Sequence, residues 1–352
     1  MNSYKIPFYV KASLLSVGML SFTGMLYISQ TIIVPLIYSF ILAIVLSPIV
    51  HFFIKKGMNK IIAISLTLLG AFMALALLIA ILYSQLSHFT DTFPKLLDKF
   101  YVLLGQFQIW ISNNFNISAV KVNSWAEETN TEILTDCRSL IGPTLVNIGS
   151  ILVVLVLIPV YLIMILFYEP LLVEFIHRLF NVKKHIAVDE VLVATKRIIR
   201  SYLIGLLLEA LIIAILNSTC LLILGIDYAI LLGVFGAILN IIPYFGGILS
   251  VLLPTFIAIV TKSPSYSLLV IGSFALIQFA DNHFIQPKVV ASKVQINALF
   301  SIIVVLAGGA FWGIPGMFLS IPLTAILKVI FDHIDGLKPW GYLLGNQSSK
   351  LD

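Results

Sequence analysis

The chain has 352 residues, of which 60% are hydrophobic and only 11% are charged. An ordinary soluble domain carries about 25% charged residues. With a mean hydropathy of +1.08, this composition excludes a soluble globular enzyme, a disordered chain and a nucleic-acid binder. We predict an all-α integral membrane protein whose surroundings are the lipid bilayer.

Four apolar blocks in the first part of the chain approach the roughly 20 residues that cross a bilayer. They cover residues 10–28, 31–54, 61–83 and 145–168. The turn after the second block carries Lys55, Lys56 and Lys60, so the positive-inside rule places this turn and the N-terminus in the cytoplasm. Most of the 21 basic residues then lie on the cytoplasmic side. This distribution explains the net charge of +5, so the charge does not indicate a nucleic-acid partner.

The segment 84–144 is expected outside the cytoplasm, between the third and fourth blocks. Leu86, Phe89, Phe93 and Leu96 repeat there at helical spacing. We predict an extracytoplasmic helical hairpin that prolongs the two membrane helices. Its apolar stripe needs a partner, which is either its own second arm or a neighbouring subunit. The returning loop 169–200 is predicted to form amphipathic helix in the cytoplasm.

The second half of the chain alternates intact and broken apolar segments. A helix at 202–224 and a full-length block at 265–285 are intact, whereas two pairs of short runs are interrupted by Gly- and Pro-rich breaks. The pairs are 229–241 with 248–260, and 297–307 with 317–331. A run of ~13 residues spans roughly 20 Å, which is short of the ~30 Å hydrocarbon core.

Breaks of this kind are tolerated at membrane depth where they line a cavity or are buried in protein. We therefore predict about six full transmembrane helices and two re-entrant helical hairpins, or about eight transmembrane elements. Two spanning pairs are the alternative, because both arrangements leave the C-terminus cytoplasmic. We divide the chain into five segments. They are 1–83 (N-terminal membrane helices), 84–144 (outer hairpin), 145–200 (fourth helix and cytoplasmic loop), 201–335 (transport half) and 336–352 (cytoplasmic tail).

Few ionisable groups lie inside the apolar blocks, where such groups default to a functional role. Glu209 is about two turns into its helix, and it either pairs with a basic residue such as Arg200 or forms a proton or cation site. Gln278 and Asp281 share a helix face. The carboxyl and amide oxygens of Glu209, Asn240, Gln278, Asp281, Asn282 and Gln286 could bind a small hard cation. Helix-end capping is the alternative role of the residues around Asp281.

The two breaks supply the remaining candidates. In the first break, Pro243 removes a backbone donor, while Gly246 and Gly247 permit conformations that other residues resist. These three residues form the tip of the predicted hairpin, with a plain turn as the alternative. In the second break, the residues proposed as a hinge or gate are Gly308, Gly309, Gly313, Pro315 and Gly316. Phe311 and Trp312 beside them anchor at the interface or gate a pathway.

Enzyme motifs such as HExxH, Walker A, GxSxG and CxxC do not occur in the sequence. We therefore expect no enzyme, no cofactor and no bound metal, with a proton or sodium as the coupling ion. A small molecule or an ion is the expected substrate.

Four motifs resemble the autoinducer-2 exporter family of bacterial membrane proteins. They are RSYLIG at 200–205, IPYFGG at 242–247, DNHFIQPK at 281–288 and GIPGMFLSIPL at 313–323. The resemblance implies a multi-pass transporter of the inner membrane that forms a homo-oligomer, with a pentamer as the expected assembly. It also implies export of the signal autoinducer-2 or exchange of sodium or lithium for protons.

The leading hypothesis is thus a secondary transporter that exports a small polar solute such as autoinducer-2, with coupling to an ion as part of the hypothesis. A sodium or lithium/proton antiporter is the main alternative. A membrane scaffold that uses the outer hairpin and a passive channel through an oligomer are the further alternatives.

Overall fold

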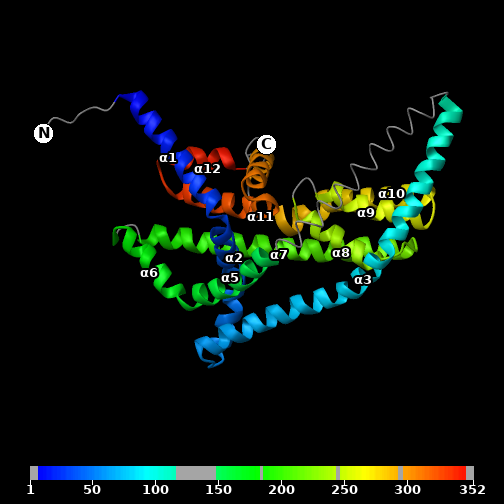
Figure 1. The fold of residues 1–352 in the computed structure, drawn as a ribbon. Coiled ribbons are helices and arrows are strands. Elements are labelled where there is room, and N and C mark those ends of the chain that lie inside the picture. Colours follow the sequence, from blue (N-terminus) through cyan, green and yellow to red (C-terminus); the bar gives the residue numbers. More distant parts are fainter. Residues whose placement is uncertain (1–6, 116–147, 183–184, 243–245, 292–295, 346–352) are drawn as a thin grey trace.

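A computed structural model describes residues 7–115, 148–182, 185–242, 246–291 and 296–345 of the chain. The described residues are organised as helices (Figure 1). In the first part they are α1 (Phe8–Ile28), α2 (Gln30–Lys55), α3 (Lys60–Phe115), α5 (Ile148–Phe167) and α6 (Glu169–Leu179). The second part begins with α7 (His185–Ile223), α8 (Ala229–Asn240), α9 (Gly246–Thr261) and α10 (Pro264–Ala280). It continues with the π-helical segments η2 (Asp281–Ile285) and η3 (Pro287–Ala291), then α11 (Ala298–His333) and α12 (Lys338–Leu344).

Within the described residues, six helices are long and apolar enough to cross a membrane. They are α1, α2, the first part of α3, α7, α10 with its π-helical continuation, and α11. The helices α5 and α6 meet the same test only as a pair bent by 67°, which would be a seventh span. This architecture confirms the predicted all-α integral membrane protein.

The helix α3 continues as a single helix of 56 residues, well beyond its membrane-length part (Figure 1). It packs against α8 and α9, and Phe100 lies 5.1 Å from Phe256 between ring centroids. The first arm of the predicted outer hairpin is therefore present as a continuation of the third membrane helix. The second arm falls within 116–147, outside the described residues.

The helix α7 is also longer than predicted. It begins at His185, so the part of the predicted amphipathic segment from residue 185 and the predicted helix from residue 202 form one continuous helix of 39 residues, whereas the earlier part of that segment forms α6. The proposed boundary between residues 200 and 201 lies inside it. This helix is the centre of the fold, because it packs against α2, α8, α10, α11 and η3.

Two short apolar helices occupy the first predicted hairpin. The helices α8 and α9 have 12 and 16 residues and pack against each other. A Cβ atom on Gly246 would lie 2.5 Å from the Cα atom of Asn240, so the return of the chain brings the two backbones into close approach. Glycine is required there because it lacks the Cβ atom. Pro243 lies outside the described residues.

The second predicted hairpin is contained in α11, whose helical geometry fails at Trp312 and Gly313. Gly313 has φ +63° and ψ −146°, a backbone conformation that glycine adopts without steric cost. A Cβ atom on Gly308 would lie 2.5 Å from the carbonyl oxygen of Gly316. In a straight helix, residues eight apart are about 12 Å apart along the axis. The chain therefore folds back on itself at Trp312–Gly313, and re-entry into the membrane stays a prediction.

Three buried apolar clusters hold the helices together. One joins α2, α7, η3 and α11 around Ile41, Ile199 and Leu319. A second joins α3 to α7, α8, α9 and α10 around Leu221 and Ile257. The third joins α2, α3 and α5. Both of the first two clusters include residues of α7, and the polar residues Glu209 and Asn217 of this helix are buried between packed helices.

Candidate functional site

A cavity of about 780 Å³ lies between α7, the end of α8, the start of α9, α10, η2 and α11. Its volume falls in the range of roughly 300–1,000 Å³ that is usual for small-molecule sites. Seven of the residues proposed from the sequence line it. They are Glu209, Asn240, Gly247, Gln278, Asp281, Asn282 and Gln286.

Asp281 is the most enclosed polar residue of this cavity, with 1% of its surface exposed. Asn240 donates a hydrogen bond from Nδ2 to Oδ2 of Asp281 at 2.9 Å. Oδ1 of Asp281 has no hydrogen-bond donor among the described residues. Asp281 also begins the π-helical segment η2, and π-helical turns within helices occur frequently at functional sites. Asn240 therefore holds one carboxyl oxygen of Asp281 in place, and the other oxygen is available to a ligand or a proton.

Glu209 is the second buried acid of the cavity, with 5% of its surface exposed. Its carboxyl group lies next to that of Asp281 in the same cavity, close enough for the two groups to interact. The ion pairs of the described residues do not include Glu209. Arg200, which the sequence offered as a partner, instead lines a different cavity. The ion pair with Arg200 is therefore not found among the described residues, and a proton or cation site at Glu209 stays a prediction.

The contact between the two acids depends on a proton. Ionised carboxylates accept hydrogen bonds and cannot donate them. A hydrogen bond between Glu209 and Asp281 therefore forms only when one of the two carries a proton. Neighbouring carboxylates of this kind titrate as a pair rather than as two separate groups.

Amide groups complete the polar side of the cavity. Gln278 donates a hydrogen bond from Nε2 to Oδ1 of Asn282 at 3.1 Å, one turn along the same helix. A Cβ atom on Gly247 would lie 2.6 Å from Cδ of Gln278, so a larger residue at the start of α9 would displace this flexible amide side chain. This contact connects the tip of the first hairpin directly to the polar wall.

The glycines and proline of the second break lie elsewhere. Gly308, Gly309 and Gly316 form the close contact of the folded-back α11, and the hydroxyl of Tyr38 donates to the carbonyl oxygen of Pro315 at 3.1 Å. These residues are not part of the cavity lining in the described structure. The glycine contacts lie within α11, the Pro315 carbonyl joins α11 to α2, and the role of these residues as a hinge or gate stays a prediction.

Sequence reasoning missed two polar residues of the cavity, Tyr202 and Ser301. Tyr202 is 5% exposed and precedes Glu209 by seven residues on α7. Residues two turns apart share a helix face, so this spacing was a usable signal. Ser301 reaches the site only through the packing of α11, and the local sequence holds no indication of it.

A membrane-embedded cavity lined by buried acids and amides, between broken helices, is the arrangement typical of transporters. The sequence matches the AI-2E family transporter over residues 17–336, and the chain belongs to this family. The protein is therefore a multi-pass membrane transporter.

Similar proteins agree with this assignment. The "Putative transport protein YueF" of Bacillus subtilis (strain 168) is 26% identical over 325 residues, covering 87% of this chain and 85% of YueF. The "AI-2 transport protein TqsA" of Escherichia coli (strain K12) is 24% identical over 323 residues, or 90% of each chain. The "Putative transport protein YrrI" of Bacillus subtilis (strain 168) is 31% identical over 132 residues, covering 38% of this chain and 37% of YrrI.

Proposed function

We propose that the protein is a secondary transporter that exports a small polar solute and couples this movement to protons. The observation that carries the proposal is the contact between the buried carboxyl groups of Glu209 and Asp281 within a polar cavity. A buried carboxyl pair is a suitable carrier of one proton, because its two members favour a shared proton over two negative charges.

The proposed cycle uses the two acids as one unit. Proton uptake joins Glu209 to Asp281 and lowers the charge of the pair from two negative charges to one. Proton release leaves an anionic site, whose charge is partly offset by the hydrogen bond from Asn240 to Asp281. Alternating access would move the half 200–332 against the half 10–168.

Autoinducer-2 is the proposed solute, because TqsA, which is similar over 90% of its length, is named as an AI-2 transport protein. The cavity of about 780 Å³ is larger than a bare cation needs. Its amides supply both donors and acceptors, which suit the hydroxyl groups of a small polar molecule.

A sodium or lithium/proton antiporter is the second candidate function. Hard cations prefer oxygen ligands, and Glu209, Asp281 and Gln278 place such oxygens along one cavity. A monovalent cation would then replace the shared proton of the acid pair. This function needs the same two acids but no organic solute.

Location and assembly are part of the same proposal. We place the protein in the inner membrane with both termini in the cytoplasm, following the distribution of Lys and Arg. We propose a homo-oligomer, because α1 is 21 residues long and buries none of its residues in the described chain. A transport role without enzymatic activity and without a cofactor completes the proposal.

Purified protein in liposomes that enclose a pH-sensitive dye provides the test. Addition of autoinducer-2 in the presence of a pH gradient should change the internal pH if export is proton-coupled. Addition of sodium or lithium should do so if the protein is an antiporter. A well-inserted protein that gives no response to any of the three would refute proton coupling. Solute flux that does not saturate and ignores the gradient would instead identify a channel.

A further inference from the structure

A second cavity, of about 850 Å³, lies between α2, the bend from α5 into α6, α7 and η3. It shares no lining residue with the cavity of the acid pair among the described residues. It is located where α5 ends at Phe167 and the chain bends by 67° into the amphipathic helix α6. A bend at the end of an apolar helix is the position expected at a membrane surface.

The polar part of this cavity is basic. Lys196, Arg197, Arg200 and Lys288 line it, whereas Glu169 is the acid among its described lining residues. The two arginines make no ion pair within the described part of the chain. The cavity therefore presents more positive than negative charge.

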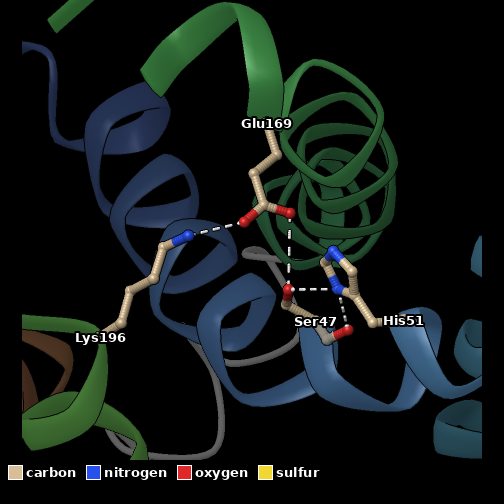
Figure 2. A network of polar contacts seen from close by, with 4 residues as sticks. All are labelled: Ser47, His51, Glu169 and Lys196. Atoms are coloured by element: carbon tan, nitrogen blue, oxygen red, sulfur yellow. Dashed lines mark hydrogen bonds and ion pairs between the residues drawn. The ribbon is translucent and has the colours of Figure 1, made fainter. Parts of the chain in front are cut away.

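The single acid of this lining is already engaged. Lys196 donates from Nζ to Oε1 of Glu169 at 2.7 Å, and Ser47 donates from Oγ to Oε2 at 3.5 Å (Figure 2). His51 lies on the far side of Ser47, with 3.1 Å between its Nδ1 and Ser47 Oγ. This network neutralises Lys196 and Glu169 against each other, so the positive charge of Arg197 and Arg200 is left for a ligand.

The remaining wall of the cavity is apolar. It includes side chains from α2, α6 and α7, such as Phe40, Leu172, Ile204 and Leu208. These four side chains are between 38% and 48% exposed, so protein atoms do not cover them fully. The cavity thus combines a basic end with an uncovered apolar wall.

We infer that this cavity binds one anionic phospholipid, with its phosphate on Arg197 and Arg200 and an acyl chain along the apolar wall. Guanidinium groups match phosphate oxygens through paired hydrogen bonds. Basic pockets between membrane helices at the cytoplasmic surface bind anionic lipid headgroups in this way. A soluble anion would leave the apolar wall uncovered, and a neutral lipid would leave the two arginines without a counter-charge.

The bound lipid would contact both α7 and η3. Lys288 and Val289 of η3 line the same cavity, and Gly205 of α7 packs directly on the carbonyl group of Val289. The segment η3 follows Gln286, which lines the transport cavity. Lipid binding would therefore support the contact between helices that separates the two cavities.

The test measures lipid retention on the purified full-length protein by native mass spectrometry. The probes are dioleoyl phosphatidylglycerol, dioleoyl phosphatidylcholine and the soluble headgroup glycerol phosphate. We expect phosphatidylglycerol to bind with a clear preference, and the double variant Arg197→Gln/Arg200→Gln to bind it roughly 20- to 30-fold more weakly. The matched control is Arg178→Gln, because Arg178 is exposed on α6, pairs with Glu174 at 2.9 Å and does not line the cavity. The control should bind as the wild type does.

Several results would overturn the inference. Equal retention of the two lipids would show that the lipid charge does not determine binding. Unchanged binding by the double variant would show that the two arginines do not bind the lipid. Glycerol phosphate that competes at the same concentration as the lipid would make this a soluble-anion site. If the assembled oligomer retains no phosphatidylglycerol, a neighbouring copy of the chain covers the cavity in place of a lipid. If the double variant does not fold, the comparison of the three probes on the wild-type protein still tests the inference.

Discussion

Replacing the two buried acids of the cavity, separately and together, tests whether they act as one proton carrier. Glu209→Gln and Asp281→Asn keep the size of each side chain and remove one ionisable group. A carboxamide can still donate a hydrogen bond to the remaining carboxylate. Since the contact with Asn240 also survives in Glu209→Gln, we expect the free energy of unfolding of each variant to stay within about 1 kcal/mol of the wild type.

The contact between the acids sets the magnitude of the effect on transport. Two unit charges about 4 Å apart repel each other by about 4 kcal/mol at an effective dielectric constant of about 20. This repulsion disfavours the doubly ionised pair by roughly a thousandfold. A neutral amide at either position removes the repulsion that makes the pair hold a proton. We expect each single variant to lower proton-coupled flux about 100-fold, a typical loss for a group that transfers protons.

The double variant separates one shared site from two independent sites. Residues that act as a unit show strongly non-additive losses. We expect Glu209→Gln/Asp281→Asn to transport no worse than the weaker of the two single variants. The assay is the rate of pH-gradient collapse in everted membrane vesicles at matched protein content, with Asp189→Asn as the control at an exposed acid. Losses that multiply in the double variant, or normal flux in both single variants, would refute the shared-proton mechanism.

Two further predictions concern the packing of α11 and are measured by thermal unfolding in detergent. Gly308→Ala should destabilise the protein by about 1–3 kcal/mol, because the new Cβ atom meets the backbone of Gly316. Gly272→Ala has open space around it and should not destabilise; equal effects of both substitutions would argue against the folded-back α11. Leu319→Ala should cost about 2–5 kcal/mol, because Leu319 is 0% exposed within the first apolar cluster. Leu306→Ala, at a side chain that is 50% exposed, should cost clearly less, and an equal loss would contradict the assigned core.

The membrane helices were predictable because their signal is local. A run of about 20 apolar residues has few folded alternatives to a membrane helix, since its backbone must satisfy its own hydrogen bonds in lipid. The short helices α8 and α9 were predictable for a similar reason, because the Gly/Pro-rich break between them interrupts the apolar pattern. The beginning of α7 was not, because an amphipathic helix and an apolar membrane helix join there without any local signal at the boundary.

The fold-back of α11 was predicted as a hairpin from the Gly/Pro-rich break between 297–307 and 317–331, with two spanning runs as the alternative. Its contact between Gly308 and Gly316 shows why glycines occur eight residues apart, since each gives room for the backbone of the other arm. The π-helical geometry that begins at Asp281 was not predicted. A π-helical turn depends on packing around the helix, here against α7, rather than on a residue preference that can be read locally.

The sequence by itself determined that this is a multi-pass helical membrane protein, which polar residues lie in its apolar blocks, and to which family it belongs. Only the tertiary structure decided how those residues combine. It placed Glu209 against Asp281 instead of Arg200, and it assigned the arginines of α7 to a separate basic cavity. The physical reason is that a contact between residues far apart in the chain depends on how whole helices pack, and periodicity along one helix contains no information about the helix that will face it.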